Sequence, residues 1–349
     1  MMVATRFKII LAVLFCSLTP SWAATGTGPA RVDKVKVDPK SEQIIQGALK
    51  FLATQQHVDG SWGVGDEARG FPIAMTGYTL MAYMSAGNLP GEGPHGKEVS
   101  RGMQYLLGII NETTGIYGDQ AHGQYMYGHG VATIAMAELY GQTRDERMRK
   151  KLQAVVERIV ASQNNQGGWR YRPVKMDADI SVTVLQVVAL RAAKNSGLDV
   201  PQRTIDEAVK YVKACYHAGS GGFCYQPGSS PGFARTAAAI YSLQVCGLYD
   251  DKWVKDGSRY LTTNFKDGQE WFVYGNFYAA PAQYMIGGET WEKWYPMVRD
   301  ILHKRVRADK NGMYRWDPSG RDGVGTVFTT AVFTMMLSMP YHYIPLYQR

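Results

Sequence analysis

The chain has 349 residues, of which 45% are hydrophobic, and its 38 Lys and Arg against 30 Asp and Glu give a formal net charge of +8. The basic residues are scattered over predicted surface helices, as in residues 147–151 and 303–307, instead of gathering with aromatic residues on one face. This scatter is typical of a solvated surface and argues against nucleic-acid binding.

The N-terminus has the pattern of a secretory signal peptide over residues 1–24. Arg6 and Lys8 precede an apolar run over residues 9–18, and residues 21–23 (Ser-Trp-Ala) end in a small residue that suits signal peptidase. The run is too short to span a bilayer, so we expect no transmembrane segment and a secreted or periplasmic protein. Residues 25–40 are expected to be a loose leader, and residues 41–349 a single domain without an internal linker.

Residues 41–349 repeat one pattern: an amphipathic helix, a glycine-rich turn closed by an aromatic residue, and a helix with almost no charge. The clearest copy runs from Gln163 through Gly167-Gly168-Trp169 into the apolar residues 182–190. A period of roughly 45 to 55 residues is typical of repeat proteins, in which neighbouring hairpins bury each other's apolar faces. The aromatic residues expected to close the six turns are Trp62, Tyr117, Trp169, Phe223, Trp271 and Tyr314.

The two kinds of helix predict two rings. A helix that is apolar on all sides must be enclosed, whereas a helix with charges on one side presents that side to water. The sequence therefore predicts an all-α fold, an (α/α)6 toroid with uncharged inner helices, charged outer helices and a central cavity. Because every turn leads into an inner helix, the inner N-termini should meet at one end, where their dipoles favour an anion or a polar head group.

The turns also resemble those of a known family. The first and third turns are similar to the glutamine-tryptophan repeat motif of squalene and terpene cyclases, and the fourth is similar to the glycine-rich turn of protein prenyltransferase beta subunits. The residues that carry these likenesses are Ala48, Phe51, Leu52, Gln55, Gly60-Ser61-Trp62, Gln163, Gly168-Trp169, Gly221-Gly222-Phe223, Pro227-Gly228 and Phe233. The resemblance to this prenyltransferase/squalene oxidase repeat family covers nearly all of residues 41–349 and implies the same toroid.

The resemblance also implies where an acid would lie. The cyclases protonate their substrate with the central Asp of an Asp-x-Asp-Asp-Thr run at the head of an inner helix. Matched from the left, Asp177 and Asp179 fit this run but Ile180 replaces the next Asp; matched on Thr183, Ser181 falls on the proton donor. The motif is incomplete in either register. The zinc ligands of the prenyltransferases are missing from the matching residues 232–236, so we expect neither a metal nor another cofactor.

Several residues near the predicted inner N-termini are candidates for chemistry or binding, each with a structural alternative. Asp177 and Asp179 either act as acids or cap a helix. His129 either contacts a ligand or is a satisfied core histidine. Arg235 either binds an anion or pairs with Asp177 or Asp179. The other candidates for lining a semi-polar pocket are Tyr127, Ser181, Tyr274 and Asn276.

We expect these groups to lie around one opening, with Asp179 facing it and Arg235 across from it, because unpaired burial of charged groups is costly. Cys215 and Cys224 bracket the fourth turn, so an exported protein is expected to join them as a disulfide, and Cys246 should remain a thiol.

Three functions are consistent with the sequence. The first is an exported toroid that binds an apolar or isoprenoid-like small molecule in its centre, with an incomplete cyclase acid motif. The second is an active class II terpene cyclase of the squalene–hopene kind that uses Asp179. The third is a scaffold that binds a protein or a glycan. A buried acid beside an apolar cavity favours the enzyme, whereas a filled centre with exposed aromatic residues favours the scaffold.

Overall fold

The computed structural model describes residues 34–63, 71–118, 125–318 and 324–347. The predicted signal peptide and most of the predicted leader lie outside these residues. Every described helix belongs to one unit, residues 33–349. None of these helices combines the length and the hydropathy that a membrane span requires.

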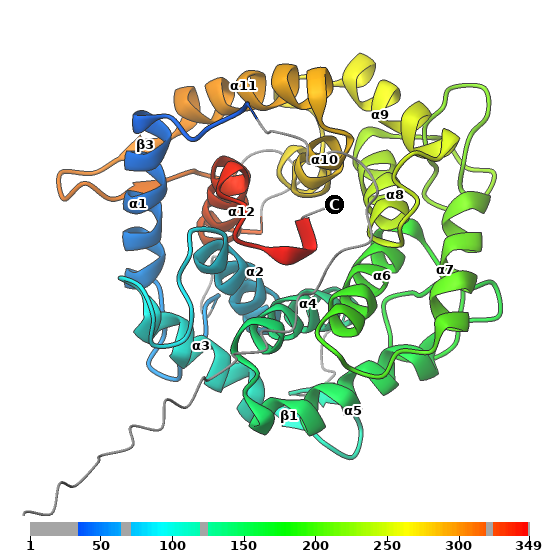
Figure 1. Cartoon of the computed structure of the whole chain (residues 1–349), viewed down its shortest axis with the longest axis horizontal. Helices are drawn as coiled ribbons and strands as arrows, with labels where there is room; N and C mark the ends of the chain where they lie inside the picture. Colours follow the sequence, from blue (N-terminus) through cyan, green and yellow to red (C-terminus); the bar gives the residue numbers. More distant parts are fainter. Residues whose placement is uncertain (1–33, 64–70, 119–124, 319–323, 348–349) are drawn as a thin grey trace, which may run out of the picture. The chain divides into compact units, whose positions relative to one another are not determined.

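The helices of this unit form two concentric rings (Figure 1). Each inner helix packs against the next one, and α12 packs against α2, which closes the inner ring. The predicted (α/α)6 toroid is confirmed. The outer ring consists of α1 (Pro39–Thr54), α3 (Gly96–Gly108), α5 (Glu146–Ser162), α7 (Gln202–Ala214), α9 (Lys252–Asn264) and α11 (Gly288–Arg305). The inner ring consists of α2 (Pro72–Ser85), α4 (Tyr125–Thr143), α6 (Ile180–Asn195), α8 (Phe233–Val245), α10 (Phe272–Ile286) and α12 (Thr326–Ser338).

Charge decides which ring a helix joins. Inner helix α12 is buried without interruption from Phe328 to Ser338, on every side of the helix. Outer helix α7 buries only the stripe that contains Ile205, Ala208 and Val212 and turns its charged residues to water. This difference follows from the cost of removing charged side chains from water.

The turns between outer and inner helices share one hydrogen bond. The backbone N–H of the closing aromatic residue donates to the hydroxyl of a threonine on the following inner helix, so the turn and the helix are joined. The pairs are Trp62 with Thr76, Trp169 with Thr183, Phe223 with Thr236 and Trp316 with Thr330, at 2.9–3.2 Å. The indole N–H groups of the three tryptophans donate back to carbonyls of the preceding outer helices, at Leu52, Ile159 and Leu302.

This pattern corrects two of the predicted turn residues. The buried aromatic residue that closes a turn is called its wedge here. In the sixth turn the wedge is Trp316, not Tyr314, because the hairpin β3 (Arg307–Ala308) with β4 (Tyr314–Arg315) moves this position two residues further along the chain. In the fifth turn Trp271 is 43% exposed and adopts a left-handed backbone with φ 58°, so it is not a wedge. Tyr117, on β2 (Ile116–Tyr117) beside β1 (Ile110–Asn111), is fully buried as expected.

A glutamine ties each of two turns to the next outer helix. Gln163 Nε2 donates to the carbonyls of Gly167 and Thr204 at 2.9 and 2.8 Å. In the first turn the equivalent residue is Gln56, not Gln55: its Nε2 donates to Gly60 and Glu98 at 3.0 and 2.9 Å. The glutamine of the repeat motif therefore fixes the spacing between neighbouring hairpins.

The interior of the ring contains aromatic side chains and the end of the chain. The ring of Tyr78 in α2 makes edge contacts with Phe277 in α10 and Phe328 in α12, with centroids 5.1 and 4.9 Å apart. After α12 the chain continues as two short 3-10 helices, η3 (Met339–Tyr341) and η4 (Pro345–Tyr347), which lie within the inner ring in Figure 1. This segment starts at the C-terminal end of α12, so it lies at the end of the ring opposite the glycine-rich turns.

Candidate functional site

Asp179 is the centre of a polar cluster at the end of the ring where the inner helices begin. It is the N-cap of α6, and its Oδ1 accepts hydrogen bonds from the Val182 N–H at 3.0 Å and the Ser181 hydroxyl at 2.5 Å. Its side chain is completely buried, and burial raises the pKa of its carboxyl above the usual value, although these bonds and Arg170 oppose the rise. Asp179 therefore caps α6.

Two tyrosines from other inner helices join this cap. The hydroxyls of Tyr127 in α4 and Ser181 are 2.7 Å apart, and the Tyr274 hydroxyl of α10 donates to the Ser181 carbonyl at 3.1 Å. Both phenols are half-buried, whereas Ser181 is 9% exposed. Three inner helices are thus joined through Ser181, which also donates to the buried carboxylate of Asp179.

The counter-ion of Asp179 is Arg170, which no sequence motif singles out. Arg170 Nη1 lies 3.2 Å from Asp179 Oδ2, and its Nε lies 3.6 Å from Asp177 Oδ2. Neither Nη1 nor Oδ2 has an aligned hydrogen-bond partner, so the contact is an ion pair with unused hydrogen-bonding capacity. Asp177 is more than half exposed and forms the outer part of the same ion pair.

Two further tyrosines hold the guanidinium of Arg170. Its carbon lies 4.5 Å from the ring centre of Tyr171 and 5.5 Å from that of Tyr225, and the two hydroxyls are 2.6 Å apart. Tyr171 follows Trp169 by two residues, and Tyr225 follows Phe223 by two residues, so they are equivalent positions of successive turns. This repeated offset is the signal that would have identified both residues from the sequence.

Arg235 lies at the edge of this cluster. Its guanidinium carbon is 5.9 Å from the ring centre of Tyr225, and its Nη1 donates to the Ser230 carbonyl at 2.8 Å. The ion pairs of Asp177 and Asp179 are made with Arg170, so the alternative in which Arg235 pairs with them is wrong. The expectation that Asp179 faces the opening is also wrong, since its side chain is enclosed by its cap and its counter-ion.

The structure places His129 and Asn276 in the core. His129 is fully buried, its Nδ1 lies 3.1 Å from the Tyr125 hydroxyl, and its ring packs edge-on against Tyr117. Asn276 is fully buried and donates to the Phe272 carbonyl at 2.8 Å, while its Oδ1 has no partner. Neither residue makes a described contact with Asp179 or Arg170.

The predicted disulfide is not formed in the structure, where Cys215, Cys224 and Cys246 are thiols. Tyr216 pairs with Phe223 in an antiparallel bridge, and the Cys224 N–H donates to the Cys215 carbonyl at 2.8 Å, so the two cysteines are opposite each other across the fourth turn. Burial raises the pKa of the Cys215 thiol to about 12, which suppresses the thiolate that oxidation requires.

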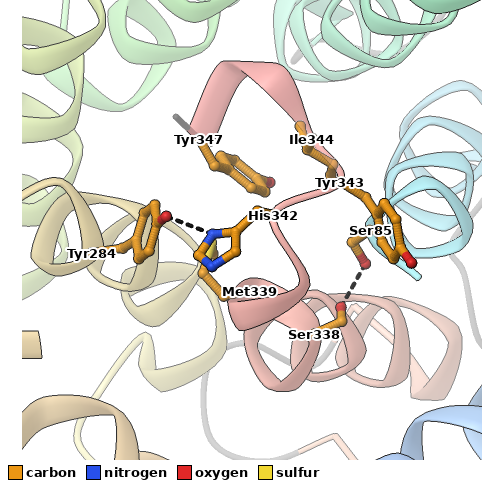
Figure 2. A pocket seen from close by; sticks show the side chains of 8 residues that line it. All are labelled: Ser85, Tyr284, Ser338, Met339, His342, Tyr343, Ile344 and Tyr347. Atoms are coloured by element: carbon orange, nitrogen blue, oxygen red, sulfur yellow. Dashed lines mark hydrogen bonds between the residues drawn. The ribbon is translucent and has the colours of Figure 1, made fainter. Parts of the chain in front are cut away.

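A pocket lies at the other end of the ring, under the C-terminal segment (Figure 2). It is a small hollow with room for about one water molecule, between the ends of α2, α10 and α12. The residues that line it include Ser85, Tyr284, Ser338 and His342. None of these four residues belongs to a motif that the sequence reveals.

Comparison with known proteins shows the family and the fold. Residues 41–234 match the family described as "Domain of unknown function (DUF6288)"; this is more than half of the chain, which therefore belongs to that family. No curated protein matches the sequence.

Solved structures with the same fold include the type II terpene cyclase MstE from Scytonema, with 12% identity, a TM-score of 0.59 and coverage of 87% of this chain and 99% of the cyclase. The cellobiose 2-epimerase from Bacillus thermoamylovorans has 12% identity, a TM-score of 0.64 and coverage of 84% and 98%. The GH76A alpha-1,6-mannanase from Salegentibacter has 10% identity, a TM-score of 0.61 and coverage of 87% and 99%. At such low identities the likeness shows the toroid fold alone, and any chemistry has to be inferred from the residues of this chain.

Proposed function

We propose that the toroid binds a hydroxyl-bearing small molecule with an apolar body at the end where the inner helices begin. In this proposal Tyr127 and Arg235 contact the ligand, and the Arg170–Asp179 ion pair holds the cluster in place. The observation that carries the proposal is the chain of hydrogen bonds from Tyr127 through Ser181 to the buried carboxylate of Asp179.

This series of hydrogen bonds determines whether the Tyr127 hydroxyl donates or accepts a hydrogen bond toward a ligand. The ionised carboxylate only accepts hydrogen bonds, so the Ser181 hydroxyl donates to Asp179 and must accept from Tyr127. The hydrogen of the Tyr127 hydroxyl is therefore used in the bond to Ser181, and its oxygen can still accept a hydrogen bond. A half-buried phenol in this state favours a ligand that donates a hydroxyl or N–H hydrogen.

Arg235 supplies the complementary donors. One of its N–H groups binds the Ser230 carbonyl, and the half-buried guanidinium carries four more N–H hydrogens. A hydroxyl group both donates and accepts, so it matches an acceptor at Tyr127 and a donor at Arg235. The rings of Tyr127 and Tyr171, stacked with centroids 5.9 Å apart, add an apolar surface.

A class II terpene cyclase is the second candidate. It is supported by the burial that raises the pKa of Asp179, because a cyclase acid must hold its proton. It is opposed by Arg170, which favours the ionised form, and by the enclosure of the carboxylate. Replacing Asp179 by Asn abolishes turnover if Asp179 is the acid, whereas it only weakens binding if Asp179 positions Ser181.

A protein or glycan partner is the third candidate. Val174, Met176 and Trp271 are 55%, 40% and 43% exposed, and all three precede an inner helix at this end of the ring. Exposed apolar groups of this kind stack on sugars or pack against proteins. Binding to glycans without any retained small molecule would favour this reading over ours.

The first experiment is mass spectrometry of the small molecules released from natively purified protein. The affinity of the identified compound is then measured by calorimetry for the wild type, for Tyr127→Phe and for Tyr105→Phe, a half-buried tyrosine on outer helix α3. We expect Tyr127→Phe to weaken binding about tenfold, as for one lost hydrogen bond, and Tyr105→Phe to have no effect. Equal affinities for all three proteins would contradict the proposal.

We also propose export, from the basic and apolar pattern of residues 1–24. N-terminal sequencing of protein from the native host should start near residue 25. A chain that still begins at Met1 in the mature protein would contradict this.

A further inference from the structure

Glu138 is the one acidic residue of inner helix α4, and it is 5% exposed. Its carboxylate accepts a hydrogen bond from the backbone N–H of Leu346, in the C-terminal segment. The titratable groups that its charge affects are Tyr241 of α8 and Tyr347 of the segment, and neither is a cation. In the described part of the chain, Glu138 is thus a buried acid held by one backbone N–H and no counter-ion.

The C-terminal segment covers this acid mainly through apolar contacts. Ile344, Leu346 and Tyr347 are 2%, 3% and 7% exposed. The ring of Tyr347 lies 6.4 Å from that of Tyr241, and its hydroxyl makes a weak contact of 3.8 Å with the sulfur of Met335. Residues 343–347 have no acidic or basic side chain, so no side-chain ion pair attaches the segment. The segment is therefore attached by few polar bonds.

The start of the segment has the features of a hinge. His342 adopts a left-handed backbone with φ 63°, which an L-residue other than glycine adopts at a cost. Its Nδ1 lies 2.6 Å from the Tyr284 hydroxyl (Figure 2). The small pocket beside it is lined by the segment together with the ends of α2 and α12, where the hydroxyls of Ser85 and Ser338 are 2.7 Å apart.

We propose that residues 343–347 form a lid over the C-terminal ends of the inner helices, and that loss of a proton from Glu138 releases it. With the lid closed, the carboxylate is shielded from water, so ionisation is disfavoured. With the lid open, water reaches the carboxylate and its charge is hydrated. The proposal adds a second, regulated access to the ring, opposite the ligand end, and it does not depend on which ligand binds there.

The size of the effect follows from linkage between protonation and opening. Burial raises the pKa of Glu138 from 4.5 to about 7 in the closed form. The closed form therefore holds the proton more tightly, and opening becomes more favourable as the pH rises between these two values. If the open form has the ordinary pKa, the ratio of open to closed lid is about tenfold higher at pH 8 than at pH 6.

Hydrogen–deuterium exchange of the full chain tests this lid without a ligand. The protection of the amides of residues 343, 344, 346 and 347, corrected for the intrinsic pH dependence of exchange, should fall about tenfold from pH 6 to pH 8, while α6 stays protected. In Glu138→Gln, which cannot ionise, the protection should be the same at both pH values. Glu157→Gln, on the exposed side of α5, should behave as the wild type.

Tyr284→Phe gives a second, independent variant. It removes the hydroxyl that holds His342, so the protection of residues 343–347 should be lower at both pH values while the tenfold pH response remains. The proposal is overturned if the wild type is equally protected at pH 6 and pH 8, if Glu138→Gln keeps the pH response, or if α6 loses protection in parallel with the segment.

Discussion

Arg170 and Asp179 form an ion pair across the third turn, with Nη1 and Oδ2 3.2 Å apart and the Asp179 side chain completely buried. The turn between outer helix α5 and inner helix α6 therefore supplies the counter-ion for the N-cap of α6. The Arg170 side chain is 19% exposed, so both charges are largely removed from water. Each charge depends on the other for compensation.

Replacing Arg170 by Met should lower the free energy of unfolding by about 3 kcal/mol, because it leaves a buried carboxylate without its counter-ion. The measurement is urea unfolding at pH 7. Arg172→Met, at an exposed position two residues away, is the matched control and should change stability by less than about 0.5 kcal/mol. The double variant Arg170→Met with Asp179→Asn should recover part of the lost stability. If Arg170→Met and Arg172→Met are equally stable, the ion pair does not stabilise the fold.

The sequence predicts the two rings well because the distinction between charged and uncharged helices reflects solvation, which acts along the whole length of a helix. It predicts the wedge aromatics less well, since a local hairpin such as β3–β4 shifts Trp316 relative to the repeat. It misses Arg170 because the ion pair depends on the path of residues 171–178, which has no periodicity. The place of Asp179 before a helix is visible in the sequence, and its capping role follows from that place.

Thr183→Val tests the bond that joins turn and inner helix. The Thr183 hydroxyl accepts the backbone N–H of Trp169 at 3.1 Å in a fully buried site, so its loss leaves that N–H unsatisfied. We expect a destabilisation of about 2 kcal/mol in urea unfolding. Thr143→Val removes a hydroxyl that donates to the Leu139 carbonyl and accepts only a long bond, 3.4 Å, from the Asp145 N–H near the half-buried end of α4, so it should cost much less. A similar cost for both would show that the bond to Trp169 is not special.

Gly167→Ala tests the close approach between hairpins. Gly167 has φ 92°, and a Cβ there would lie 2.1 Å from the Glu207 carbonyl of the next outer helix, so the substitution combines backbone strain with a steric clash. Gly228 is the matched control, with φ 81° and open space for at least 4 Å around the position that a Cβ would take. Gly228→Ala should cost about 1 kcal/mol and Gly167→Ala at least about 3 kcal/mol in thermal or urea unfolding. Equal costs would mean that the hairpins separate easily.

The Cys215–Cys224 disulfide remains a prediction for the exported protein. The antiparallel bridge between Tyr216 and Phe223 places the neighbouring Cys215 and Cys224 opposite each other, and a disulfide that closes this short loop would stabilise the fold by about 2 to 3 kcal/mol. Peptide mapping without reductant should detect the linked pair in protein taken from an oxidising compartment. Both cysteines alkylated in full under those conditions would contradict the prediction.

His129 should make the fold sensitive to acid. It is fully buried, and burial lowers the pKa of its imidazole to about 3, against an ordinary value near 6.5. The unfolded chain therefore binds a proton that the folded chain does not, so stability is full above pH 6.5 and falls as the pH decreases toward 3. Between pH 7 and pH 5 this residue alone should lower the free energy of unfolding by about 2 kcal/mol.

The variant His129→Gln tests this. It should be less stable than the wild type at pH 7 because packing is lost, but its free energy of unfolding should change about 2 kcal/mol less than that of the wild type between pH 7 and pH 5. His57→Gln, at a half-exposed position, should keep the wild-type dependence. If His129→Gln follows the wild-type curve, with a constant offset from pH 7 to pH 5, the imidazole is not the group that makes the fold sensitive to acid.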